Sequence, residues 1–444
     1  MFIGQYMRRR NRLIRILFLF LALMPACNIW GGPSANYYYF RTSSGGKIYC
    51  IIDNKTERTV KTTSKLSCRY KDSNFISVTF TRNVVQEVSG AVTIPSQVDL
   101  RHCDELYGID ESVGRYTVVG FLDDSFNGCS NLTSITLPST TKTVAGAFIN
   151  CTNLKTINLP TTIEYVSNNF AQGCERLEAV NVGSGQGVKY HSFDGILCRE
   201  GEVYFCPPSC KSDVVLPSTI KAIGNDVFAN HHALLSVKVN SGATIGNGAF
   251  KNCTNLKDVI LCDGVKSIGS NAFSDCVSIE QINIPGSVKE IGNQAFKGCL
   301  SLVSVKLNEG LDCVNNQAFQ DCMFLKNISF PQSLRKIWAE AFANCTSLEN
   351  ITFPEGGKCD YTGTGAFYFC SSIKEIQFPS SMGYIGEKAF MGCTALERVV
   401  LNPQIKEIDR YAFFGCSSLS SINLPKETKI YEETFMQCDN LVLP

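Results

Sequence analysis

Residues 272–292 of the chain read AFSDCVSIEQINIPGSVKEIG, and residues 295–315 read AFKGCLSLVSVKLNEGLDCVN. Both stretches place a Cys three residues after a Phe and continue with apolar residues that alternate with polar ones. The same pattern returns from about Phe121 to the C-terminus, mostly in steps of 22 or 23 residues. The phenylalanines that mark it, called here the ladder phenylalanines, are Phe126, Phe148, Phe170, Phe228, Phe250, Phe273, Phe296, Phe319, Phe342, Phe367, Phe390, Phe413 and Phe435. The chain is therefore built from repeats, which the irregular stretch SFDGILCREGEVYFCPPSC interrupts at residues 192–210.

One repeat shows why the units must stack. In CTNLKTINLP, residues 151–160, Leu154, Ile157 and Leu159 alternate with polar residues, as in a short strand with one buried face. Pro160 then ends the strand and turns the chain. A single unit cannot bury its apolar face, whereas stacked units share a continuous core. The sequence therefore predicts a repeat solenoid of short parallel β-strands, with units of about 23 residues.

The N-terminal part of the chain does not carry the repeat. Arginines between Arg8 and Arg15 precede a short apolar run from Ile16 to Met24, which is the layout of a secretory signal peptide. We expect residues 1–27 to be this signal, ending either with lipid attachment to Cys27, in LALMPAC, or with ordinary cleavage after Ala26. Residues 28–110 are predicted to form a small all-β capping module, and residues 111–444 the solenoid, with an irregular unit at about 185–217.

The recurring AFxxCxxLxxIxLPxxxxxIG resembles the BspA-like class of leucine-rich repeats, over roughly residues 92–444. The stretch FDGILCREGEVYFCPP, residues 193–208, resembles a variant repeat that this family often inserts. The resemblance implies a secreted or surface-anchored protein, in one form an outer-envelope lipoprotein, that binds an extracellular protein or glycan ligand in adhesion. Two alternatives stay open: a structural envelope protein without a specific ligand, and an accessory glycan-binding protein.

Most of the 22 cysteines follow the repeat. Those three residues after a ladder phenylalanine are Cys129, Cys151, Cys253, Cys276, Cys299, Cys322, Cys345, Cys370, Cys393, Cys416 and Cys438; together with Cys174 they are called here the ladder cysteines. So regular a position is interpreted as an interior one, where a small apolar thiol packs. Disulfides between repeats are the main alternative in an exported chain. Metal binding by these cysteines is less favoured, because histidines and CxxC pairs do not accompany them.

The remaining cysteines leave more than one interpretation open. Cys206 and Cys210 flank Pro-Pro-Ser in the irregular unit, and they could form a local disulfide or stay free; the same holds for Cys50 and Cys68 in the capping module. His231 stands where the repeat expects a Cys, beside His232. We interpret the pair as a variant repeat with one partly exposed imidazole rather than as a metal site.

Charge and motifs exclude several classes of function. With 41 basic and 40 acidic residues the net charge is +1, which gives no reason to expect nucleic acid as a partner. The sequence shows no nucleophile elbow, phosphate-binding loop or HExxH motif, so we expect neither an enzyme nor a bound cofactor or metal. A membrane would be contacted only through a lipid at the N-terminus.

The residues beside the buried Ile of each strand point outward in this prediction, and they form the candidate ligand-binding face. Its members are Lys238, Lys257, Asp258, Glu280, Gln281, Asn283, Lys306, Asn327, Glu349, Glu375 and Arg398. Solenoids present such surfaces to ligands. The alternative is that these residues are simply solvated. Trp338, in a turn beside Ile337, is the one exposed aromatic candidate.

Overall fold

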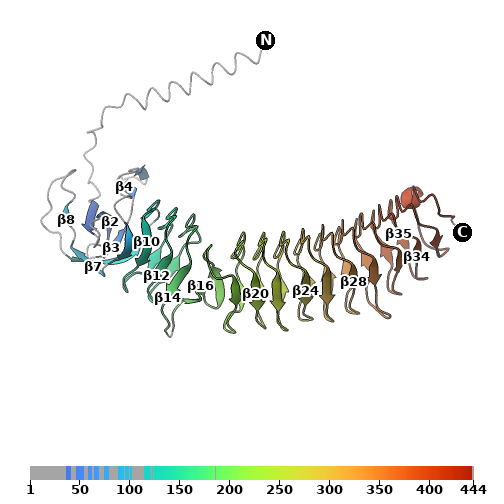
Figure 1. Cartoon of the computed structure of the whole chain (residues 1–444), viewed down its shortest axis with the longest axis horizontal. Helices are drawn as coiled ribbons and strands as arrows, with labels where there is room; N and C mark the ends of the chain where they lie inside the picture. The colour runs from blue at the N-terminus through green and yellow to red at the C-terminus, as the bar shows by residue number, and fades with distance from the viewer. Residues whose placement is uncertain are drawn as a thin grey trace, which may run out of the picture.

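The computed structural model describes residues 37–41, 47–54, 59–62, 65–69, 75–79, 89–94, 96–99, 101–102, 115–121, 123, 125–185 and 187–442. The repeats among them form a β-solenoid of about 13 turns with ~23-residue spacing, which bends into a shallow arc (Figure 1). The predicted fold class, a solenoid of short parallel strands, is confirmed.

Each repeat contributes one strand to each of two faces. The long-strand face consists of β6 (Gly90–Thr93), β10 (Leu132–Thr136), β12 (Thr156–Leu159), β14 (Ala179–Val182), β18 (Asp213–Val215), β20 (Ser236–Val239), β22 (Asp258–Leu261), β24 (Gln281–Ile284), β26 (Ser304–Leu307), β28 (Asn327–Ser329), β30 (Asn350–Thr352), β32 (Glu375–Gln377), β34 (Arg398–Val400) and β36 (Ser421–Ile422). Its strands pair in parallel as sheets of four, three and seven strands. In β12, Ile157 and Leu159 are buried, because side chains of a strand alternate between its two sides.

The short-strand face lies on the other side of the core. It consists of β11 (Thr143–Val144), β13 (Tyr165–Val166), β15 (Tyr190–Phe193), β16 (Ile196–Arg199), β17 (Glu202–Phe205), β19 (Ala222–Ile223), β21 (Thr244–Ile245), β23 (Ser267–Ile268), β25 (Glu290–Ile291), β27 (Cys313–Val314), β29 (Lys336–Ile337), β31 (Tyr361–Thr362), β33 (Tyr384–Ile385) and β35 (Glu407–Ile408). The strands from β15 onward make one 12-stranded sheet. A short 3-10 helix, η2 (Glu432–Phe435), follows the last strands.

Most of the N-terminal strands extend the two faces, and two of them, β4 (Lys65–Arg69) and β5 (Phe75–Thr79), form a separate two-stranded sheet with each other. The others are β1 (Tyr37–Arg41), β2 (Lys47–Asn54), β3 (Thr59–Thr62), β7 (Gln97–Asp99), β8 (Arg101–His102) and β9 (Arg115–Phe121). β6 pairs with β10, and β9 pairs with both β3 and β11. Val92 and Ile94, inside the predicted capping module, are buried in the same core as the first repeats.

The ladder phenylalanines form the centre of the core. From Phe228 to Phe435 their rings stack with centroids 4.9 to 5.5 Å apart. At the irregular unit both faces are interrupted, because β15, β16 and β17 run antiparallel and separate β14 from β18. The buried residues accordingly fall into two clusters, one ending at Leu197 and the other starting at Ile196. Among the described residues, no helix has the length and apolar character needed to cross a membrane.

Candidate functional site

All members of the candidate ligand-binding face lie exposed on the long-strand face, within β20–β34 or directly before one of these strands. Asn283 and Lys306 stand at the same register on β24 and β26, and the Asn308 amide donates a hydrogen bond of 2.7 Å to Asn283 Oδ1. The Asn350 amide donates in the same way to Asn327 Oδ1, at 2.7 Å. The face is therefore a band of mainly polar side chains that crosses successive repeats.

Two ion pairs join members of this face across neighbouring repeats. Lys257 Nζ lies 3.0 Å from Glu280 Oε1, and Arg398 lies 3.5 Å from Glu375 Oε1. The hydrogen bond to Glu280 raises the pKa of Lys257 above its ordinary value. All four side chains are at least half exposed, so these pairs contribute little to stability and leave their charges available to a ligand.

The sequence-based prediction missed an apolar patch beside this face. Val215 on β18 and Ile260 on β22 flank Lys238 in register, and they are 61% and 54% exposed. Exposed aliphatic side chains in one column add apolar contact area to a binding surface, which polar residues alone do not supply. The signal was present in the sequence, because both residues occupy the outward strand position of their repeats.

On the short-strand face, aromatic side chains replace polar ones in three consecutive repeats. The Trp338 and Tyr361 rings are tilted at 58° with centroids 5.6 Å apart, and the Tyr361 and Tyr384 rings stack with centroids 5.4 Å apart. Trp338 was predicted to be exposed; the structure corrects this, because Trp338 is only partly exposed, with Tyr361 against its ring and Lys336 Nζ 5.3 Å from the ring centre. These ring contacts join three consecutive repeats, so the row stabilises the solenoid.

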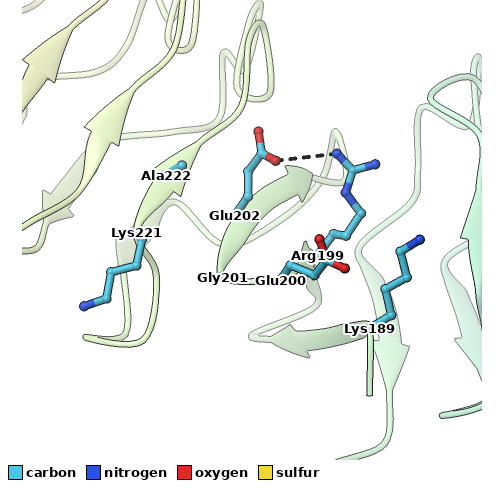
Figure 2. A pocket seen from close by; sticks show the side chains of 7 residues that line it. All are labelled: Lys189, Arg199, Glu200, Gly201, Glu202, Lys221 and Ala222. Carbon is cyan, nitrogen blue, oxygen red and sulfur yellow. Dashed lines mark ion pairs between the residues drawn. The ribbon is translucent and has the colours of Figure 1, made fainter. Parts of the chain in front are cut away.

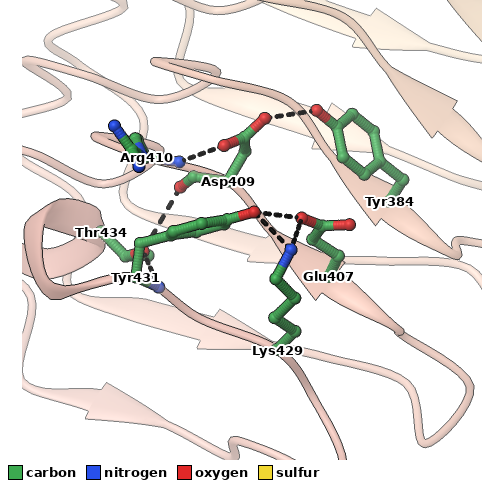
Figure 3. A network of polar contacts seen from close by, with 7 residues as sticks. All are labelled: Tyr384, Glu407, Asp409, Arg410, Lys429, Tyr431 and Thr434. Atoms are coloured by element: carbon green, nitrogen blue, oxygen red, sulfur yellow. Dashed lines mark hydrogen bonds and ion pairs between the residues drawn. The ribbon is translucent and has the colours of Figure 1, made fainter.

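The aromatic row ends in a polar network at the last repeats (Figure 3). The Tyr384 hydroxyl donates to Asp409 Oδ2 at 2.6 Å, and the Tyr431 hydroxyl donates to Glu407 Oε1 at 2.6 Å. Lys429 Nζ is 2.8 Å from the same Glu407 oxygen, and its hydrogen bond lowers the pKa of Glu407. The Asp409 and Glu407 carboxylates already accept hydrogen bonds from neighbouring repeats, so the network links the C-terminal repeats to one another.

An open hollow of about 420 Å³ marks the irregular unit on the short-strand face (Figure 2). Its lining includes Lys189, Lys221 and the ion pair of Arg199 with Glu202, whose atoms are 3.6 Å apart. The Arg199 guanidinium also lies 4.5 Å from the ring centre of Tyr204, and burial raises the pKa of Tyr204 to about 12. Beside the Arg199–Glu202 pair the lining includes two lysines and Glu200, so the charge of the hollow is mixed.

The ladder cysteines occupy the interior, as predicted, and the structure adds a reason for their identity. Every one is buried and free. From Cys151 onward, each thiol donates to the backbone carbonyl of a ladder phenylalanine in the preceding repeat, for example Cys299 Sγ to Phe273 O at 3.3 Å and Cys253 Sγ to Phe228 O at 2.9 Å. Burial raises the pKa of Cys299 well above that of an ordinary thiol.

The off-ladder pair Cys206 and Cys210 meets His231 in the interior. The two Sγ atoms are 3.0 Å apart, and Cys210 Sγ is 3.8 Å from His231 Nδ1. His231 was predicted to belong to a variant repeat with one partly exposed imidazole; His231 itself is 5% exposed, and the exposed imidazole is that of His232. The sequence could not bring these three groups together, because the irregular unit breaks the repeat count between them.

Several predicted features fall outside this description. Residues 1–27, with Cys27, lie outside the described residues. Cys50 and Cys68 lie on β2 and β4, but their side chains are not among those described.

Comparison with known proteins identifies the family. The family model "BspA type Leucine rich repeat region" matches in six copies, over residues 115–199, 201–324 and 313–442. The chain belongs to the BspA-type leucine-rich repeat family. No curated protein matches the sequence.

Solved structures of other bacterial leucine-rich repeat proteins are similar to the chain. A leucine-rich repeat protein from Bacteroides ovatus ATCC 8483 aligns over 90% of this chain and 99% of its own, with 21% identity and a TM-score of 0.56. A leucine rich cell surface protein from Faecalibacterium prausnitzii A2-165 aligns over 91% of this chain and 93% of its own, with 22% identity and a TM-score of 0.43. At these identities the first likeness supports the fold alone.

Proposed function

We propose that this BspA-type protein is a non-enzymatic binding protein that acts outside the cytoplasm, in adhesion, and that a protein or glycan ligand binds to the long-strand face between β18 and β34. The observation that carries the proposal is the row of exposed side chains at equivalent positions on consecutive parallel strands. Because neighbouring strands lie about 4.8 Å apart, such a row offers an extended ligand regularly spaced contacts.

The composition of the face supports a macromolecular ligand rather than a small molecule. Charged pairs such as Lys257 with Glu280 stay largely in water, while Val215 and Ile260 add apolar area next to Lys238. A mixture of a small apolar centre and a polar, solvated margin is typical of protein interfaces. Binding energy should therefore be spread over several repeats, with no single residue behaving like a catalytic group.

The proposal is tested by reversing charges on the face. Lys257→Glu, Glu280→Lys, Lys306→Glu and Arg398→Glu are made singly and together, and binding is measured against extracellular matrix proteins and a glycan array. The combined variant should lose binding, while circular dichroism and melting temperature stay those of the wild type, because the side chains are exposed.

Two controls make this test specific. The double variant Lys257→Glu with Glu280→Lys keeps the ion pair but exchanges its charges. A loss of binding in this variant would come from the changed charge pattern and not from the loss of the ion pair. Lys142→Glu breaks a comparable pair with Glu164, 3.0 Å apart, beside β11 and β13 on the short-strand face, and should not change binding. If the combined face variant binds every ligand as well as wild type does, the long-strand face is not the site.

A further inference from the structure

The end of the irregular unit places three soft or borderline metal-ligand groups in one buried spot. Cys206 directly follows β17 and Cys210 lies in the next turn, whereas His231 belongs to the following repeat, three residues after the ladder Phe228. Their exposed fractions are 4%, 7% and 5%. The two Sγ atoms and a ring nitrogen of His231 all lie within 4.8 Å of one another.

The orientation of the imidazole is fixed by the fold. His231 Nε2 lies 3.4 Å from the Cys206 carbonyl oxygen. This contact takes the place of the hydrogen bond that a ladder thiol makes to the preceding repeat. When Nε2 carries the proton and donates it to this carbonyl, the lone pair resides on Nδ1, which faces Cys210 Sγ at 3.8 Å. A backbone acceptor on one ring nitrogen is the arrangement that orients a histidine whose other nitrogen binds a metal.

The two thiols differ from the ladder cysteines in what they face. A ladder thiol donates to a phenylalanine carbonyl, whereas Cys206 Sγ and Cys210 Sγ are 3.0 Å from each other. Two cysteine sulfurs beside an imidazole lone pair are a preorganised set of metal-ligand groups.

A disulfide between the two cysteines would satisfy this arrangement less well. It would consume both thiols and leave the lone pair of His231 Nδ1 directed at a sulfur that has no proton to donate. A metal ion engages all three groups at once. Thiolate and imidazole together favour thiophilic ions such as Zn²⁺ over hard cations such as Mg²⁺ or Ca²⁺.

We propose that Cys206, Cys210 and His231 are the protein ligands of a buried Zn²⁺ ion that ties the irregular unit to the following repeat. Binding releases the two thiol protons to solvent and leaves one position of a tetrahedral shell for water or another exogenous ligand. This inference departs from the sequence-based expectation that no metal is bound. It does not depend on the proposed ligand-binding role of the long-strand face.

The position of the site suggests what the ion does. Both strand faces are interrupted at the irregular unit, and the core divides there. Cys206 and Cys210 lie on the C-terminal side of this division, in the second core cluster, where β17 pairs with β19 and β18 pairs with β20. An ion held by residues 206, 210 and 231 therefore adds a cross-link within the first turns of the second part. Metal binding to the folded chain alone also stabilises that fold in proportion to the affinity.

The test uses the full chain, which is reduced, freed of metal and titrated with Co²⁺. A Co²⁺ ion bound by thiolates gives a charge-transfer absorption, which reports sulfur ligation. We expect one equivalent of Co²⁺ to bind with this absorption, and one equivalent of Zn²⁺ to displace it and raise the melting temperature. Cys206→Ser and Cys210→Ser should each lose the absorption. Cys262→Ser and His232→Ala are the matched controls, since these residues lie off the ladder or outside the cluster, and both should bind as wild type does.

A second variant keeps the test decisive if the serine variants fold poorly. His231→Cys restores the residue that the repeat carries elsewhere, so it should fold, and a third thiolate should strengthen the charge-transfer absorption. An unchanged spectrum in His231→Cys would remove His231 from the site. The whole proposal is overturned if the folded, reduced wild-type chain takes up no Co²⁺ or Zn²⁺, or if Cys206→Ser and Cys210→Ser bind metal as wild type does.

Discussion

At the scale of single residues, the ladder cysteine is the most informative position. It must be small and apolar, because it is fully buried beside the stacked phenylalanines, and its thiol has one carbonyl to donate to in the preceding repeat. The sequence predicts the burial from the fixed spacing after each Phe. It could not predict the hydrogen bond, because the acceptor is a backbone atom of another repeat.

This contact sets the expected cost of replacing a ladder cysteine. In Cys299→Ser the hydroxyl can donate to Phe273 O, as the thiol does. The variant should therefore lose only about 1 kcal/mol of unfolding free energy, which is at the low end of the cost of burying a hydroxyl. In Cys299→Val the added methyl group crowds the adjacent repeats and forfeits the donor, and the loss should reach about 2 kcal/mol. Urea unfolding of both variants measures the two losses of unfolding free energy. A larger loss for Cys299→Ser than for Cys299→Val would contradict this account.

At the scale of the repeat unit, the sequence predicts the long strands well and the other elements poorly. The alternation in residues 151–160 places β12 correctly because it reports one buried face. The two-residue strands of the short-strand face, such as β23, are too short to show any alternation, and they form only because the neighbouring repeats supply their partners. The meeting of Cys206 with His231 likewise depends on the irregular unit and is invisible to a count of residues.

The turns of the repeat explain a recurring sequence signal. The Asn of each NCT triplet adopts a left-handed backbone, with φ of 58° at Asn150, 57° at Asn252 and 61° at Asn344. Gly298 and Gly415 take the same place in other repeats, with φ of 71°. Asn tolerates this conformation better than other non-glycine residues. The triplet therefore follows from the geometry of the turn.

A pair of substitutions at Asn252 tests this interpretation. Asn252→Ala puts a Cβ without a local hydrogen bond into a left-handed backbone and removes the donor to Asn230 Oδ1, 2.8 Å away, so it should cost about 1–2 kcal/mol of unfolding free energy. Asn252→Gly removes the same donor but relieves the backbone, and it should cost clearly less. Equal losses in thermal or urea unfolding would show that the hydrogen bond, rather than the backbone, selects Asn.

At the scale of the whole molecule, the irregular unit divides one continuous solenoid into two cores. Within each part, neighbouring repeats are joined by strand pairing on the short-strand face, by pairing on the long-strand face except between β22 and β24, and by the stacked phenylalanines. Across the division, no sheet of described strands joins the two parts, and the connection includes the Tyr204 hydroxyl donating to Val166 O at 2.7 Å and Ser209 N donating to Leu177 O at 2.9 Å. Because repeats interact with their neighbours alone, the two parts should respond separately to local damage.

Matched core substitutions on either side of the division test this expectation. Ile157 on β12 and Ile282 on β24 occupy equivalent buried positions in the two clusters, and replacing either by Ala should cost about 2–5 kcal/mol locally. Native-state hydrogen exchange should then show that Ile157→Ala lowers amide protection from β6 to β14 and leaves β20–β34 unchanged, whereas Ile282→Ala does the reverse. Protection that falls throughout the chain in either variant would mean that the solenoid unfolds as one cooperative unit. The antiparallel strands of the irregular unit would then transmit stability as well as any regular repeat does.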